Sequence, residues 1–242
     1  MCKPITLFLF LYIAIGYSQP QEPLLNPPGT LQMDSKIYID RTPVTNKMFL
    51  EYLTAKDFLR KKGFSEFRDY EVTLDDTLTR LTSIYPSYLL NLKGVYGKDL
   101  KAEYVEDYKY KDNPVLGVSK EQAADYCKWR TQMVSYLWRT HPGHLQKKPF
   151  AGRIYYRLPL PEELQHASDY FSEQNRLLTI KGENPLKFKA PENAEEFSLY
   201  NITEYTQAST TYGENYKGIK PVSFPNEVTG FRCVCEVLPE EE

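Results

Sequence analysis

Residues 113–130, NPVLGVSKEQAADYCKWR, contain the beginning of the clearest helix in the chain and place a cysteine in its middle. Ser119 is a suitable N-cap, and Gln122, three residues later, completes a capping box. One face of the predicted helix is formed by Ala123, Cys127, Arg130, Val134 and Leu137. Cys127 therefore points toward the core. This position argues against a nucleophile, because a reactive thiolate needs an electropositive and partly exposed site.

The N-terminus, residues 1–19, is predicted to be a secretory signal peptide: one lysine precedes an apolar run over 5–15, and the small residues Gly16 and Ser18 follow. The run is about half of the roughly 20 residues that a membrane-spanning helix needs, so no stable transmembrane anchor is predicted. We expect cleavage near Ser18 or Gln19. Cys2 precedes the apolar run and therefore cannot carry the lipid of a mature lipoprotein. The sequence predicts an exported protein that is periplasmic, at the cell surface or secreted.

The mature chain is predicted to form one domain, because no linker divides it. An extended, proline-rich lead-in is expected over 20–33, the domain over 34–238 and an acidic tail over 239–242. Hydrophobic spacing predicts a strand over 36–40, a helix beginning near Thr45, a short helix over 74–81, and a strand over 154–158 before a helix with Pro161 in its first turn. Short aromatic or β-branched segments after Asn184 predict further strands. This order of elements indicates an α+β fold with much irregular chain.

Charge and motifs exclude several classes of function. The chain has 30 basic and 32 acidic residues, so no basic field is present to attract nucleic acid. It has no glycine-rich phosphate loop, no GxSxG and no HExxH, and no catalytic residue is nominated by pattern. His141 and His144 lie in a Pro-Gly turn and would need two further ligands to bind a metal, and His166 is expected at the polar boundary of a helix. No metal site is therefore predicted.

The cysteines that remain after loss of the signal peptide are Cys127, Cys233 and Cys235. In an exported chain we expect one disulfide and one leftover thiol. Cys233 and Cys235 would point to the same face of a strand, too far apart for an easy bond with each other. The residues alone therefore leave Cys127 paired with either of them.

Four segments in order resemble one family. They are YIDRTPVTNKMFLEYL, NPVLGVSKEQAADYCKW, YRLPLPEELQHAS and TGFRCV, and together they cover most of the mature chain. The chain is thereby similar to the formylglycine-generating enzyme, or sulfatase-modifying factor, domain. The resemblance implies a fold related to C-type lectins. It also implies a disulfide between Cys127 and Cys233, with Cys235 a small buried residue.

The resemblance also shows which functional residues of the family this chain lacks. Formylglycine-generating members use a pair of cysteines shortly before the closing motif to bind copper(I), whereas the corresponding stretch here, GIKPVSFPNEV, contains none. Calcium is not predicted either, because the segment SLYNITEYTQAS has Asn201 where aspartate is usual and retains only Glu204 with Tyr205 of the family pattern. Lys120 replaces a usual tryptophan, and Leu160 replaces a helix-capping threonine. No cofactor is therefore expected.

Retained framework motifs beside an emptied catalytic stretch predict a divergent pseudoenzyme. The leading hypothesis is an exported, non-catalytic binding or structural module with an envelope or secreted protein partner, of the kind found in gliding-motility or secretion assemblies. Arg157, Asn201, Glu204 and Arg232 are then framework contacts or remnants of a site. One alternative is an oxidase with a divergent active site that uses the Cys235 thiol. Another is a binder of carbohydrate or an envelope polymer, with stacking faces from the tyrosine-rich region 84–110.

Overall fold

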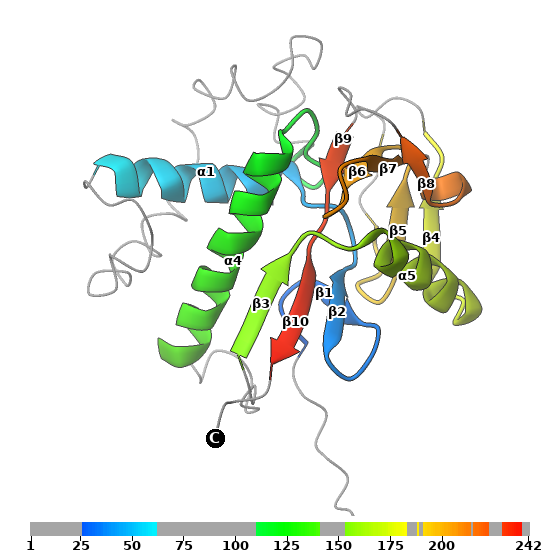
Figure 1. Ribbon diagram of the computed structural model, residues 1–242, viewed down its shortest axis with the longest axis horizontal. Coiled ribbons are helices and arrows are strands. Elements are labelled where there is room, and N and C mark those ends of the chain that lie inside the picture. Colours follow the sequence, from blue (N-terminus) through cyan, green and yellow to red (C-terminus); the bar gives the residue numbers. More distant parts are fainter. Residues whose placement is uncertain are drawn as a thin grey trace, which may run out of the picture.

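The computed structural model describes residues 26–61, 110–140, 153–182, 188, 191–213, 215–222 and 229–238. The predicted signal peptide, the helix expected over 74–81, His141, His144 and the acidic tail lie outside these residues. In the described part of the chain, three α-helices accompany three small sheets (Figure 1). The helices are α1 (Asn46–Lys61), α4 (Lys120–Thr140) and α5 (Pro161–Glu173). The α+β class predicted from the sequence is confirmed.

The first sheet has the strand order β1-β2-β10-β3, and all its neighbouring strands are antiparallel. Its strands are β1 (Thr30–Gln32), β2 (Ile37–Asp40), β3 (Arg153–Arg157) and β10 (Val234–Leu238). The last strand of the chain thus lies between two earlier ones, with Val234 opposite both Ile39 and Arg157. β1 lies within the range 20–33 that was predicted as a lead-in, so the paired structure begins at Thr30 rather than at 34.

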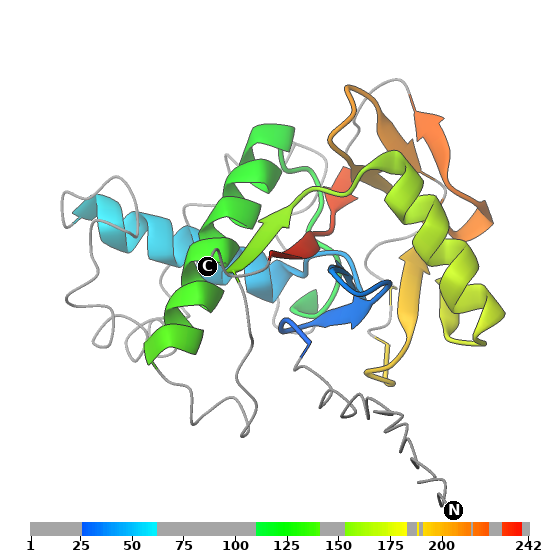
Figure 2. The ribbon, with the colours of Figure 1, turned by 60° about the horizontal axis from the view of Figure 1, so that its bottom comes forward.

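Alternation along these strands builds a core on each face of the sheet. Tyr38, Tyr156 and Cys235 belong to the cluster that contains the buried face of α4, together with α1. Ile39 and Val234 belong to a second cluster, which includes the buried side chains of α5. The strands therefore lie between α4 and α5 (Figure 2).

The predicted beginnings of two helices are confirmed. At α4 the Gln122 N–H donates to Ser119 Oγ at 3.2 Å, and the Ser119 N–H donates to Gln122 Oε1 at 2.8 Å. α5 begins at Pro161, and the N–H of Leu160 donates to the Glu163 carboxylate at 2.7 Å. Because leucine has no side-chain acceptor, α5 keeps only one half of the reciprocal capping interaction.

The strands after α5 form two smaller sheets. β4 (Leu177–Ile180) pairs in parallel with β5 (Phe197–Tyr200). The other sheet has the order β8-β7-β6-β9, formed by β6 (Thr203–Tyr205), β7 (Thr211–Gly213), β8 (Lys220–Val222) and β9 (Thr229–Phe231), with the short 3-10 helix η6 (Asn215–Lys217) between β7 and β8. Gly213 lies opposite Thr203, where a Cβ would come within 2.2 Å of the Thr203 Cγ2 atom. A larger residue at 213 would therefore separate β6 from β7.

Candidate functional site

Arg232 and Glu204 form a fully buried ion pair. Glu204 lies in the middle of β6, Arg232 directly follows β9, and these two strands are parallel neighbours. The Arg232 Nε donates to Glu204 Oε2 at 2.6 Å, and its Nη2 donates to Oε1 at 2.8 Å. Both side chains have an exposed fraction of 0%. The pairing is therefore a bidentate arginine–carboxylate contact inside the protein.

The remaining donors of Arg232 bind carbonyls from other elements. Nη1 donates to the carbonyl of Asp40 at 3.2 Å, and Nη2 donates to the carbonyl of Ser198 at 2.9 Å. The guanidinium carbon lies 4.5 Å from the centre of the Phe197 ring. Glu204 Oε1 also accepts from the Asn215 side-chain amide at 2.9 Å. One ion pair thus connects β2, β5, β6 and η6.

A second buried ion pair connects α4 to the sheet. The Arg130 Nη1 donates to Asp40 Oδ2 at 2.8 Å, and the same oxygen accepts from the Cys233 N–H at 2.8 Å. Arg130 also donates to the carbonyl of Pro28 at 2.6 Å and stacks over Tyr156 with its guanidinium carbon 4.3 Å from the ring centre. This pair was not predicted from the sequence. The position of Arg130 on the buried face of the predicted helix was the feature that could have indicated a buried ion pair.

The cysteine residues meet where α4 crosses the sheet. The Sγ atoms of Cys127 and Cys233 are 3.1 Å apart, and both side chains are buried. Here the two residues are thiols in contact, since a disulfide bond is about 2.05 Å long. The predicted disulfide stays a prediction. Burial raises the pKa of Cys233 well above its usual value, and the neighbouring Cys127 raises it further. Burial likewise raises the pKa of Cys235 to about 12, so neither thiol is disposed to ionise near neutral pH.

Arg157 belongs to a separate, half-buried cluster at the beginning of α5. Its Nη1 and Nη2 donate to the two Glu163 oxygens at 2.7 and 2.6 Å, and its Nε donates to Glu236 Oε1 at 2.6 Å. The hydrogen bonds to Glu163 raise the pKa of Arg157 more than partial burial lowers it. The cluster fixes the first turn of α5 to β3 and β10. It is not part of the Arg232 network.

Asn201 does not join either ion pair. It is half-buried in the turn between β5 and β6, where its N–H donates to the carbonyl of Ile180 at 3.2 Å. His166 is exposed on α5. Of the four polar residues singled out from the sequence, the structure therefore brings together only Glu204 and Arg232.

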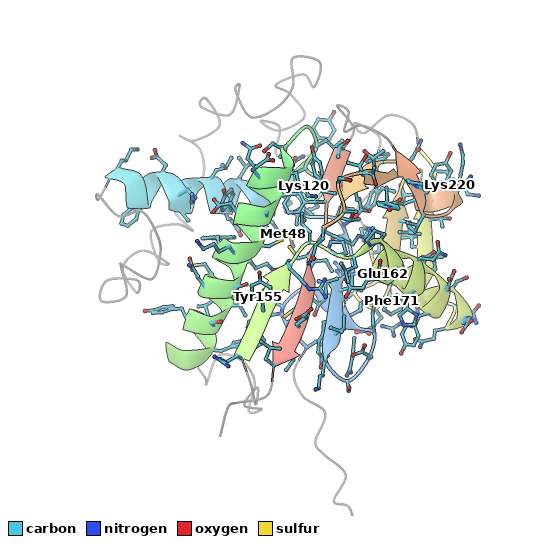
Figure 3. All side chains as sticks on the ribbon, in the orientation of Figure 1. Met48, Lys120, Tyr155, Glu162, Phe171 and Lys220 are labelled. Atoms are coloured by element: carbon cyan, nitrogen blue, oxygen red, sulfur yellow. The ribbon has the colours of Figure 1, made fainter. Side chains whose placement is uncertain are left out.

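Lys120, at the first position of α4, contacts the chain just beyond β6. Its Nζ donates to the carbonyl of Gln207 at 3.0 Å and to the carbonyl of Ala208, both just beyond β6. Figure 3 labels this side chain at the end of α4 nearest β6 and β7. The lysine therefore ties α4 to the chain that follows β6.

The residues present do not fit the metals that the family resemblance raises. Both Glu204 oxygens are engaged by Arg232, and one also by Asn215, so this carboxylate offers no free oxygen to calcium. The stretch 218–228 contains no cysteine, and the three cysteines that the structure describes lie in the core. Within the described residues no group of three His, Cys, Asp or Glu side chains is placed to hold a metal ion.

Comparison with known families identifies the class of protein. A family model of the sulfatase-modifying factor enzyme 1-like domain matches residues 13–223, and the chain belongs to this family. The match ends before β9 and β10, although β10 lies between β2 and β3 in the first sheet and completes the same fold. Searches of curated proteins and of solved structures found no match. In the described part of the chain, no helix is long and apolar enough to cross a membrane.

Proposed function

We propose that this chain is an exported, non-catalytic binding or structural module of the sulfatase-modifying factor family, which acts by holding a protein partner in an envelope assembly such as one for gliding motility or secretion. The observation that carries the proposal is the stretch 218–228, GIKPVSFPNEV, which has no cysteine where copper-dependent relatives have a pair. A copper(I) site needs soft thiolate ligands, and this stretch supplies none.

The chemistry of the remaining cysteines supports the same proposal. Cys235 is the thiol that an alternative oxidase would have to use, and it is buried with a pKa raised to about 12 by burial. Cys127 and Cys233 are buried against each other. A thiol that attacks a substrate or binds copper must be deprotonated and reachable. All three thiols are buried, and burial raises the pKa of Cys233 and of Cys235.

The buried charges support a framework role for the polar residues. Glu204 and Arg232 satisfy each other and are closed to solvent, so they cannot touch a substrate in this conformation. We propose that they, with Arg157, hold the sheets and α5 in place, and that neither copper nor calcium is a cofactor.

Aldehyde formation on a sulfatase peptide tests the non-catalytic part of the proposal. The purified, full mature chain is incubated with copper(I), oxygen and a cysteine-containing sulfatase peptide, and the product is measured by mass spectrometry. We expect no formylglycine above the protein-free control, with a catalytically competent family member as the positive control. Formylglycine that depends on this chain, and that disappears in Cys235→Ser, would establish the oxidase alternative.

Crosslinking in the native cells tests the export and partner parts. The tagged chain is fractionated, its mature N-terminus is determined, and covalent crosslinks are mapped. We expect an N-terminus near Gln19 and a stoichiometric envelope protein crosslinked to the domain. Retention of residues 1–19 in a cytosolic fraction would refute export, and a clean monomer without a partner would refute the assembly role.

A further inference from the structure

The outer edge of β4 has backbone groups that point away from the protein. In the parallel pair β4–β5, the carbonyls of Arg176 and Ile180 accept hydrogen bonds from the N–H groups of Phe197 and Asn201. Even-numbered residues of this strand therefore direct their peptide groups to β5, and the odd-numbered Leu177 and Thr179 direct theirs outward. Figure 1 draws β4 at the rim of the molecule, outside β5.

The other sheet edges are closed in ways that β4 is not. At β3 the outward N–H of Tyr156 donates to Thr131 Oγ1 on α4 at 2.8 Å. The carbonyls at both ends of β9 accept from the N–H groups of Val44 and Gly117. β1 and β8 have only three residues each, and β8 contains Pro221. These are the usual protections of an edge strand. In contrast, no group within the described residues is hydrogen-bonded to the outward face of Leu177 or Thr179.

β4 is nevertheless held firmly enough to present this edge. Leu177 packs against the cluster beneath α5, whereas Ile180 packs against the cluster beneath α4. All four side chains of the strand, with the sequence LLTI, are half-buried. The strand thus has apolar, β-compatible side chains on both faces and neither proline nor charge between its ends. Such an edge is a template for an additional strand.

Charge at the ends of β4 indicates what kind of strand fits. Arg176 is paired with Glu195 at 3.0 Å, but Lys181 is exposed and has no carboxylate partner within the described residues. Residues 176–182 contain two cations and no acidic residue. A second copy of β4 would bring Lys181 and an Arg176 already paired with Glu195, and its strand has no carboxylate to offer to Lys181, which is unfavourable. An extended segment with apolar residues and a terminal carboxylate is complementary.

We propose that the outer edge of β4 binds an extended peptide segment of a protein partner, which adds as a third strand beside Leu177 and Thr179 and places an acidic residue near Lys181. This inference rests on the proposed function, because it assigns the surface by which the module holds its partner. Backbone hydrogen bonds to Leu177 and Thr179 supply the affinity, and the exposed sides of the β4 side chains select alternating apolar residues.

Amide-resolved hydrogen exchange of the full mature chain tests the proposal. The probe is a synthetic peptide of alternating valine and threonine with a glutamate at each end, added at millimolar concentration. We expect it to slow exchange of the Leu177 and Thr179 amides and to leave the Leu178 amide, already bonded to β5, unchanged. No slowing at these two amides would overturn the proposal. Slowing that appears without peptide and grows with protein concentration would assign the edge to a second copy and would also overturn it.

Three variants locate the binding. Thr179→Pro removes an outward N–H without removing a bond to β5 and should abolish binding, whereas the matched Thr179→Ala keeps the N–H and should bind normally; unchanged protection of the Leu178 amide verifies folding. Lys181→Glu should weaken binding of the glutamate-ended peptide roughly 3- to 10-fold and strengthen binding of a lysine-ended peptide. Equal binding by all variants would refute the site. If the peptide does not bind at β4 while a protein partner is crosslinked elsewhere on the domain, the proposed β4 site is refuted and the proposed function stands.

Discussion

Replacing Arg232 by methionine tests whether the buried ion pair holds the domain together. The change removes four hydrogen bonds, two to Glu204 and two to the carbonyls of Asp40 and Ser198, and leaves a carboxylate with an exposed fraction of 0%. Breaking a buried pair in this way costs about 3–5 kcal/mol, because the remaining charge is uncompensated. The free energy of unfolding should therefore fall by a large part of the 5–15 kcal/mol typical of a domain.

Urea unfolding followed by tryptophan fluorescence measures this cost, since both tryptophans of the chain lie on α4. The matched control is Arg176→Met, which breaks the pair with Glu195 at the surface, where the two side chains are 32% and 73% exposed. That change should cost at most about 1 kcal/mol.

A double-mutant cycle isolates the ion pair itself. The variant carrying both Arg232→Met and Glu204→Gln should be more stable than the sum of the single changes implies, by about 1–3 kcal/mol, because the second change removes the stranded charge. A cost for Arg232→Met as small as that for Arg176→Met, or strict additivity in the cycle, would refute the reasoning.

The remaining predictions concern the cysteines and the beginning of α5. Cys127→Ser and Cys233→Ser should each destabilise the oxidised protein by several kcal/mol and to the same extent, because the predicted bridge would close a loop worth about 4–5 kcal/mol; unequal costs in urea unfolding would show that the pairing is wrong. Leu160→Thr supplies the missing side-chain acceptor at the N-cap and should stabilise the protein by about 0.5–1 kcal/mol, seen as a higher melting temperature; a lower melting temperature would contradict this prediction. The pKa of Cys235 is raised by burial to about 12, so the folded state retains a proton that the unfolded state loses. Stability should therefore fall as pH rises above the ordinary thiol value, and Cys235→Ala should make that fall shallower in urea unfolding repeated across alkaline pH.

Local patterns in the sequence predicted the local elements well. The capping box at Ser119 and Gln122 and the first-turn proline at Pro161 each identify a helix from a few adjacent residues, and both helices begin there. The strand predicted over 154–158 is β3, which spans Arg153–Arg157. Such signals depend on hydrogen bonds between neighbours in the chain, and that is why the sequence suffices for them.

Pairings between distant segments were not accessible in the same way. The contact of Arg130 with Asp40 spans 90 positions, and nothing local to either residue names the other. β1 begins at Thr30, shortly before the predicted domain boundary at 34, and it is a strand only because β2 lies beside it. The open edge of β4 depends on the order of all the strands, so it could not be predicted from the sequence either. The order of the predicted elements indicated the α+β class and the family resemblance implied the related fold, but neither indicated these contacts.

The family motifs bear on activity only if their residues are not already explained by a role in folding. Arg232 lies in the closing motif TGFRCV, and Glu204, with Tyr205, is what SLYNITEYTQAS retains of the family pattern, so both charged residues invite a catalytic assignment. Their geometry accounts for them without one, because each satisfies the other's charge in a position closed to solvent. Removing either one alone would strand a buried charge, so folding is sufficient to explain why both residues are present. Family motifs that folding explains give no support to catalysis by themselves, and the proposed non-catalytic role rests instead on the absence of cysteine from residues 218–228.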